Sequence, residues 1–330
     1  MHIFKNTNYN FLRWRWHAIA FSSAIVIAGI VTISTKGLAK GVEFAGGTVV
    51  IEQFEQPVTD EQVRAALEQT FGQNLIINVY GDPSQRQMMI RVPQVGAESG
   101  ASLASMADAV EKALAGANLG GFKRLGTEIV GPAVGADLTN KAISATILSL
   151  VGILAYISFR FQLSFAVGAV VATIHDLAVT FAFLAFFGYD LTLNVIAALL
   201  TIAGYSTNDT IVIFDRVREN LRSMRRDSLD QVINVAINQT LGRTIITSGT
   251  ALLSSVALLF FGGDVLKGFA FTMVVGIVTG TYSTVFIAAA IVSFWRGAGP
   301  TRAAAHAPAA AAAPQQPTRR SKPQRKAKAS

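Results

Sequence analysis

Six long apolar runs constrain the fold of this chain more than any other feature of its sequence. A transmembrane helix needs about 20 consecutive apolar residues, and most of these runs approach that length. Only 15% of the residues are charged, against about 25% in an ordinary soluble domain. The runs predict six transmembrane helices at residues 18–34, 139–159, 165–187, 191–214, 244–261 and 266–294.

One soluble portion, residues 37–138, interrupts the series between the first and second runs. Its hydrophobic periodicity alternates between that of strands and that of helices, and Thr59 followed by Gln62 predicts a helix-capping box. The order is β-α-β-β-α-β, the ferredoxin-like pattern of a small α+β domain. The expected strands lie at 47–54, 75–80, 88–92 and 122–130, and the expected helices at 59–71 and 102–115.

Catalysis is not expected of this soluble portion, because it contains no histidine, no cysteine and no recognisable nucleophile motif. The whole chain has no cysteine, and its four histidines are scattered, so neither a metal site nor a cofactor is expected. Binding or mechanical work is therefore a better interpretation than an enzyme.

Basic residues mark one side of the predicted membrane protein. Arg13 and Arg15 precede the first run, Arg160 follows the second, and five arginines lie between residues 216 and 226. Cytoplasmic segments carry an excess of Lys and Arg, so both ends are predicted to be cytoplasmic and the soluble domain to lie outside. The first run, within residues 1–36, could be a cleaved signal peptide. It is longer than the usual core of about 7–15 residues, and we favour a retained helix.

Glycines at two places suggest local roles. Gly131, Pro132 and Gly135 separate the soluble domain from the second run, which suits either a hinge or a plain linker. Gly276 and Gly280 are four residues apart in the sixth run. Such spacing lets two helix backbones approach closely, so it predicts a packing face.

Two basic segments accompany the predicted helices of residues 139–296. Residues 216–240 combine arginines with apolar residues at helical spacing, which predicts an amphipathic helix on the cytoplasmic interface. The tail, residues 297–330, is rich in Ala, Pro, Lys and Arg and is expected to be disordered and to contact anionic lipid headgroups. Nucleic-acid binding is the weaker interpretation, because no folded basic domain accompanies the tail.

An aspartate inside the fourth run, Asp209, is the strongest functional candidate. Placing such a charge at membrane depth costs roughly 2.5–3.5 kcal/mol unless something pairs with it. Arg243 opens the fifth run at a similar depth, so we predict an Asp209–Arg243 pair with Asn208 and Thr247 beside it. Asp215, at the end of the fourth run, is expected to be an interfacial charge.

His175 and Asp176 add two titratable groups in the third run. With the previous residues they predict a proton pathway of Asp209, Arg243, Asn208, Thr247, His175 and Asp176. Buried polar groups also hold membrane helices together, by about 0.6 kcal/mol each. Helix packing therefore remains the alternative role, above all for His175 and Asp176.

The segment from Ala197 to Asn220, AALLTIAGYSTNDTIVIFDRVREN, closely resembles the fourth-span signature of the SecF branch of the SecD/SecF protein-export family. Shorter matches occur at residues 44–47, 131–135, 267–270 and 280–283. One departure is Glu43, where the family usually has aspartate before its Phe-x-Gly-Gly element.

The resemblance implies a subunit that pairs obligatorily with SecD in the bacterial inner membrane, in a complex related to the resistance-nodulation-division transporters. Such a complex assists the SecYEG channel and the SecA motor, with YajC as a further partner. It uses the proton-motive force to draw a translocating polypeptide outward, and Asp209 and Arg243 occupy the family's proton-pathway positions. Two alternatives stay open, namely a structural or assembly subunit without its own proton path, and half of a related small-molecule or lipid exporter.

Overall fold

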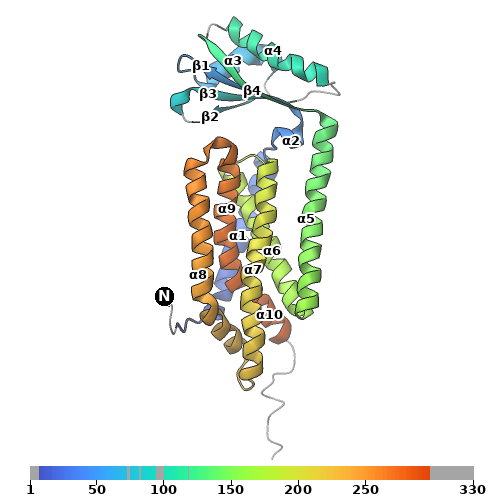
Figure 1. The fold of residues 1–330 in the computed structure, drawn as a ribbon, viewed down its shortest axis with the longest axis vertical. Coiled ribbons are helices and arrows are strands. Elements are labelled where there is room, and N and C mark those ends of the chain that lie inside the picture. Colours follow the sequence, from blue (N-terminus) through green and yellow to red (C-terminus); the bar gives the residue numbers. More distant parts are fainter. Residues whose placement is uncertain (1–6, 73–74, 82, 94–99, 118, 298–330) are drawn as a thin grey trace, which may run out of the picture.

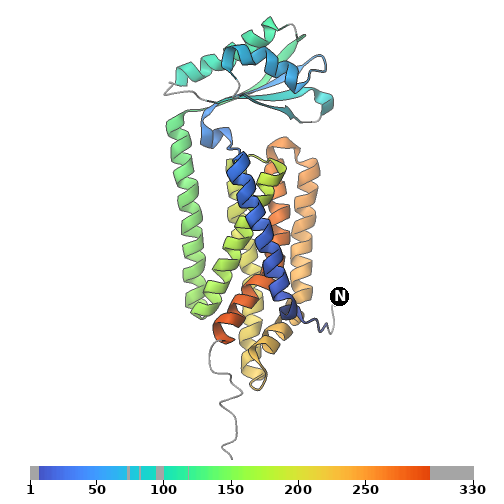
Figure 2. The same ribbon diagram turned by 180° about the vertical axis from the view of Figure 1, so that it is seen from behind.

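The computed structural model describes residues 7–297 except for 73–74, 82, 94–99 and 118. The predicted tail lies outside the described residues from residue 298 onward. The chain forms a bundle of long helices with a small sheet-containing domain at one end (Figure 1). The first helix of the bundle begins, and the last helix ends, at the end of the bundle opposite the sheet (Figure 2).

Six helical segments of the described chain are long and apolar enough to cross a membrane. The last crossing is interrupted by one π-helical turn, Thr284–Ala288. The chain is thus built as a multi-pass membrane protein. The crossings are made by α1 (Arg15–Lys36), α5 (Pro132–Arg160), α6 (Leu163–Phe187), α7 (Leu193–Ser223), α8 (Leu229–Phe261) and, together, α9 (Gly263–Ser283) and α10 (Ala289–Gly297).

Small residues allow helices of the bundle to approach one another closely. A Cβ atom at Gly29 of α1 would overlap Ala182 of α6, and one at Gly276 of α9 would overlap Ile202 of α7. At Gly280 the added atom would lie 3.0 Å from the Cβ of Ser206. Gly276 and Gly280 therefore let α9 approach α7 closely, as expected for small residues four apart.

The soluble domain is a four-stranded antiparallel sheet in the order β2-β3-β1-β4. Its helices α3 and α4 lie on the face of the sheet away from the bundle (Figure 1). Every strand and helix lies within two residues of its predicted bounds, and the capping box of Thr59 and Gln62 is present. The elements are α2 (Val42–Ala45), β1 (Gly47–Phe54), α3 (Asp60–Phe71), β2 (Ile76–Tyr80), β3 (Gln87–Pro93), α4 (Gly100–Gly116) and β4 (Phe122–Val130), with short 3-10 turns at Phe11–Trp14 and Pro83–Gln85.

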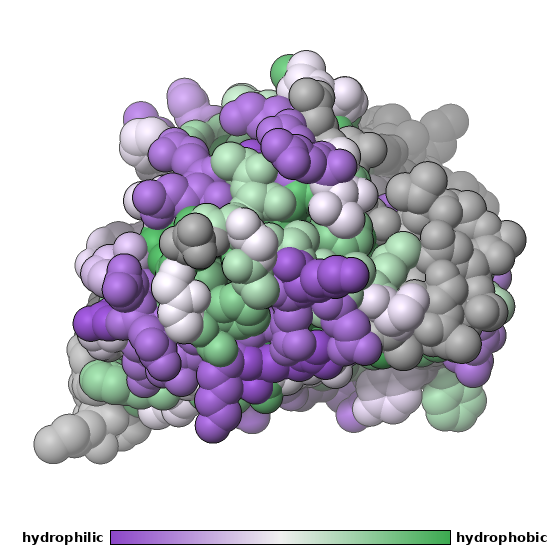
Figure 3. Space-filling model, turned by 90° about the horizontal axis from the view of Figure 1, so that it is seen from above, coloured by the Kyte–Doolittle hydropathy of each residue, from purple (hydrophilic) through white to green (hydrophobic). Residues whose placement is uncertain are grey.

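The core of this domain lies between the sheet and its two helices. Val50, Ile90, Leu67 and Leu114 are fully buried there, and each such side chain contributes roughly 1.5–3 kcal/mol. Glu52 is fully buried in the same domain, and neither carboxylate oxygen has a hydrogen-bond partner among the described residues. The outer end of the domain is mostly hydrophilic, with smaller hydrophobic areas between the polar side chains (Figure 3).

The predicted amphipathic helix at 216–240 is wrong as a separate element. Helix α7 continues without a break to Ser223, and α8 begins at Leu229. Ser228 caps α8 with Gln231, so the chain turns only at residues 224–228. The basic residues therefore lie on the end of α7 and in the turn that follows it, where α7 and α8 project beyond the rest of the bundle (Figure 1).

The predicted hinge forms the start of a helix. Gly131 is the N-cap of α5, and Pro132 is its first residue, where the missing N–H of proline costs nothing. Gly135 lies in the first turn of α5, and a Cβ atom there would be 3.1 Å from the carbonyl oxygen of Phe44 in α2. Gly135 therefore allows α2 to pack on α5, and movement at this point stays a prediction.

Candidate charged site in the membrane bundle

Asp209 lies on the buried face of α7 and is only 4% exposed. The hydroxyl of Ser248 in α8 donates a hydrogen bond to its Oδ2 atom at 3.0 Å. Ser248 in turn accepts from the hydroxyl of Thr281 in α9 at 2.9 Å. The carboxylate therefore sits where α7, α8 and α9 meet, and one hydroxyl is its hydrogen-bond partner among the described residues.

The predicted pair of Asp209 with Arg243 does not form a direct contact, because no ion pair within 4.0 Å joins the two described side chains. Arg243 and Thr247 lie on the exposed face of α8, whereas Thr244 and Ser248 face inward. Successive residues of an α-helix are rotated by about 100° from one another. Thr244 and Ser248 therefore face inward although each directly follows an exposed residue. Arg243 still lies near enough for its charge to act on Asp209.

Asn208 also differs from its prediction, since it is exposed on α7 rather than packed around the aspartate. The buried neighbours of Asp209 in sequence are hydroxyls. Thr207 donates to the carbonyl oxygen of Ala203, and the hydroxyls of Thr210 and Thr284 are 3.0 Å apart. The surroundings of Asp209 are thus lined by hydroxyl groups that bond mainly to one another and to the helix backbone.

Asp176 forms a second buried carboxylate site, on α6, and is fully buried. Its Oδ2 atom accepts hydrogen bonds from Ser206 of α7 at 2.5 Å and from Ser283 of α9 at 2.8 Å. The Nδ1 atom of His175 lies 3.2 Å from the other oxygen, and the imidazole stacks on the ring of Tyr282. Asp176 therefore ties three helices together.

The two sites meet on α9. Thr281 bonds to the partner of Asp209, and Ser283, two residues later, bonds to Asp176. The π-helical turn of the sixth crossing follows directly, and such turns often occur at functional sites. Two clusters of hydroxyls and carboxylates thus lie close together in sequence on α9, and groups of this kind can pass protons. Among the described residues, no cluster of three or more His, Asp or Glu side chains could hold a metal ion.

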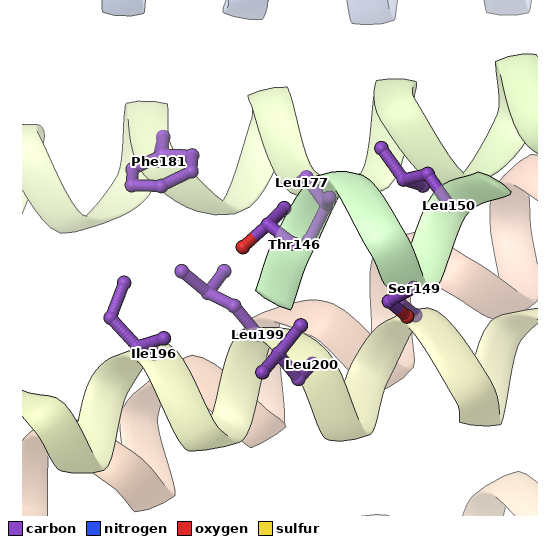
Figure 4. Close-up of a pocket in the computed structure, with 9 residues that line it drawn as sticks. Thr146, Ser149, Leu150, Leu177, Phe181, Ile196, Leu199 and Leu200 are labelled. Carbon is purple, nitrogen blue, oxygen red and sulfur yellow. The ribbon is translucent and has the colours of Figure 1, made fainter. Parts of the chain in front are cut away.

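An apolar cavity elsewhere in the bundle contains none of the predicted site residues. It lies between α5, α6 and α7 and is small, with a volume of about 30 Å³. Leucine, isoleucine, phenylalanine and alanine side chains line it, and its only polar lining groups among the described residues are the hydroxyls of Thr146 and Ser149 (Figure 4).

Sequence reasoning did not identify the hydroxyl partners of the two aspartates, which are Ser206 and Ser283 for Asp176 and Ser248 for Asp209. A signal for Ser248 exists in α8, because Thr240, Thr244 and Ser248 recur every four residues and all are buried. Such a stripe of small polar residues predicts the face that packs on polar neighbours.

Comparison with known proteins agrees with this architecture. Residues 109–298 match the family described as protein export membrane protein SecD/SecF, C-terminal. The chain is 39% identical to the protein translocase subunit SecF of Desulfurispirillum indicum, over 87% of this chain and 91% of that protein. It is 38% identical to the SecF subunit of Escherichia coli O157:H7, over 86% of each chain.

Two solved structures are similar as well. The chain superposes on SecDF from Thermus thermophilus, a translocon-associated membrane protein, with a TM-score of 0.78 and 34% identity. A second SecDF structure, in a super-membrane-facing form, gives a TM-score of 0.65 and 33% identity. The match covers 88% and 89% of this chain but only 39% of each SecDF chain. The six crossings, the inserted domain and the high identity over nearly whole relatives show that the chain belongs to the SecF branch of the SecD/SecF family of protein export membrane proteins.

Proposed function

We propose that this protein is the SecF-type half of a proton-coupled complex that assists protein export across the bacterial inner membrane. The ferredoxin-like domain, so named for its strand order, would lie outside, and both chain ends would lie in the cytoplasm. SecD is the proposed obligate partner. The other partners implied by the family, namely SecYEG, SecA, YajC and the translocating polypeptide, belong to the same proposal.

The observation that carries the proposal is the position of Asp209 beside an uncovered polar surface. On α7 and α8 the exposed face includes Asn208 and Arg243, whose side chains make no hydrogen bond or ion pair with any described residue. Leaving an arginine or an amide against lipid costs free energy, because lipid offers no hydrogen-bonding partner. This surface therefore fits a polar partner helix, as the other half of the complex would supply.

Buried polar atoms without partners support a path for water near the two carboxylates. The Nε2 atom of His175, the hydroxyl of Tyr205 and the hydroxyl of Thr244 are buried without a hydrogen-bond partner among the described residues. Such atoms in a native interior usually bond to an internal water molecule. Water at these positions would join the polar groups around the two carboxylates.

In the proposed cycle a proton neutralises Asp209 and removes its attraction to the charge of Arg243. The hydrogen bond from Ser248 then weakens as well, because bonds to an ionised acceptor are stronger than bonds to a neutral one. Helices α7 and α8 can then separate or slide. Each proton that crosses supplies about 2.3 kcal/mol per 100 mV of membrane potential.

Asp209→Asn tests the proposal in the complex with SecD, reconstituted with SecYEG and SecA in vesicles. We expect the variant to assemble and yet to lose the stimulation of export by a proton gradient. Asp215→Asn is the matched control, since this aspartate shares the motif but is exposed, and it should keep the stimulation. Full stimulation in the Asp209→Asn complex would refute the proton-coupled function.

A structural subunit is the second candidate, and the three-helix junction at Asp176 favours it. If Asp209 also serves only to hold helices together, Asp209→Asn should release SecD rather than uncouple the assembled complex. Co-purification of SecD with the variant distinguishes these two functions before any export is measured.

A further inference from the structure

A buried ion pair joins the soluble domain to the membrane bundle. Arg91 of β3 donates from Nη2 to Oδ2 of Asp190 at 2.7 Å, and the two side chains are only 5% and 19% exposed. Asp190 lies in the short turn between α6 and α7. These are the two helices that bear Asp176 and Asp209, so the pair is connected to the charged site through α6 and α7.

Backbone hydrogen bonds reinforce the same contact. The amide of Leu191 donates to the carbonyl oxygen of Ala39 at 2.8 Å, and the amide of Gly41 donates to that of Leu191 at 2.7 Å. Lys40 and Leu191 thereby form a parallel β-bridge. Arg91 also donates from Nη1 to the carbonyl oxygen of Lys40 at 2.9 Å. The α6–α7 turn, the exit from α1 and strand β3 are thus fastened at one point.

The sheet side of this contact is rigid. Residue Arg91 is paired with Val49 of β1 and with Ile76 of β2, so it lies on a strand that is bonded on both sides. A Cβ atom at Gly41 would lie 2.9 Å from the carbonyl oxygen of Leu191. Glycine is therefore needed for the backbone to approach the turn. Displacing the turn would displace the whole sheet rather than one side chain.

We propose that Arg91 and Asp190 act as a positioning pair that transmits movement between the α6–α7 turn and the outer domain. This inference rests on the proposed proton-coupled function. The pair would be a second connection between the outer domain and the bundle, in addition to the covalent connection through α5. Removing either partner would leave a buried charge uncompensated, so the contact should open when one is lost. Reversing both charges should let it re-form.

The contact between the soluble domain and the α6–α7 turn can be measured without measuring export. The chain contains no cysteine, so two introduced cysteines can report on this contact alone. Neighbouring strands lie about 4.8 Å apart, within the range of Cα separations that a disulfide tolerates. Lys40→Cys with Leu191→Cys would therefore report on the β-bridge in the full chain bound to SecD in vesicles. We expect Arg91→Ala and Asp190→Asn each to slow disulfide formation about tenfold, and the swap Arg91→Asp with Asp190→Arg to restore it to within about twofold. An unchanged rate of disulfide formation in both single variants would refute the positioning pair, whatever the result of the export assay.

Export then tests whether the contact transmits movement. Arg91→Ala should bind SecD but lose stimulation by the proton gradient. In the combination of Arg91→Ala with the two cysteines, oxidation should restore the stimulation, because a covalent bond replaces the ion pair, and reduction should remove it again. Failure of the oxidised protein to recover would overturn the transmitting role. If Asp209→Asn instead keeps full stimulation, the proton-coupled function fails while the docking result stands by itself.

Discussion

The two buried aspartates of the bundle lie in differently built regions. Asp176 accepts hydrogen bonds from two serines on two other helices and has a histidine beside it. Asp209 has one serine donor and lies next to the exposed polar face of α7 and α8. A carboxylate with several fixed donors is held in one arrangement, whereas a carboxylate with one donor can exchange it at lower cost. We therefore propose that Asp176 anchors the helices and that Asp209 is the switching group.

The largest effect expected from this comparison is at Asp176. Asp176→Ala would leave the hydroxyl of Ser206 buried without an acceptor and would leave Ser283 only the carbonyl oxygen of Gly280. The free energy of unfolding should fall by about 4 kcal/mol. The midpoint of thermal unfolding in detergent measures the loss. Asp176→Asn keeps one oxygen acceptor and should lose less. An alanine variant as stable as the wild type would show that this junction does not anchor the helices.

Glu52 is a third buried carboxylate, and unlike the two aspartates it has no hydrogen-bond donor among the described residues. Its pKa is raised to about 7, mainly by burial and also by the negative Glu111 of α4, whereas Arg124 of β4 acts to lower it. Folding therefore favours the protonated acid. The resulting stability is complete below the unfolded-state pKa of about 4.5 and is lost as the pH rises through about 7.

Glu52→Gln tests that pH dependence. Between pH 4.5 and pH 8 the wild-type domain should lose about 3 kcal/mol of stability relative to the variant, because the charged form is penalised by burial. Amide hydrogen exchange of strand β1 in the full chain measures this difference. Glu55→Gln is the control, since Glu55 is exposed at the end of the same strand. Identical pH profiles for wild type and Glu52→Gln would contradict the buried titration.

The smallest effect is expected at the single donor of Asp209. Ser248→Ala removes one hydrogen bond to a carboxylate and should cost about 1.5 kcal/mol in stability. The same change should alter the pH at which the proton gradient stimulates export, because it acts on the switching group. Thr247→Ala is the matched control on the exposed face of α8. If Ser248→Ala destabilises as strongly as Asp176→Ala, the assignment of separate roles is wrong.

The soluble domain shows how far local sequence patterns reach. Its strands and helices begin and end within two residues of their predicted positions, because periodicity and capping residues such as Thr59 act over only a few residues. The segment at 216–240 was harder to predict. Its arginines indicated an interface, yet nothing before residue 224 stops α7 from continuing as a helix.

The sequence by itself determined the six crossings, the inserted α+β domain and the presence of Asp176 and Asp209 at membrane depth. Length, hydrophobicity and residue type are local properties, so no contact had to be known. Only the tertiary structure decided the partners of these residues. The rotation of α8 presents Ser248 rather than Arg243 to Asp209, and the fold brings Arg91 to Asp190 across 99 residues of sequence. Such contacts depend on how whole helices and the sheet pack together, which no short stretch of sequence encodes.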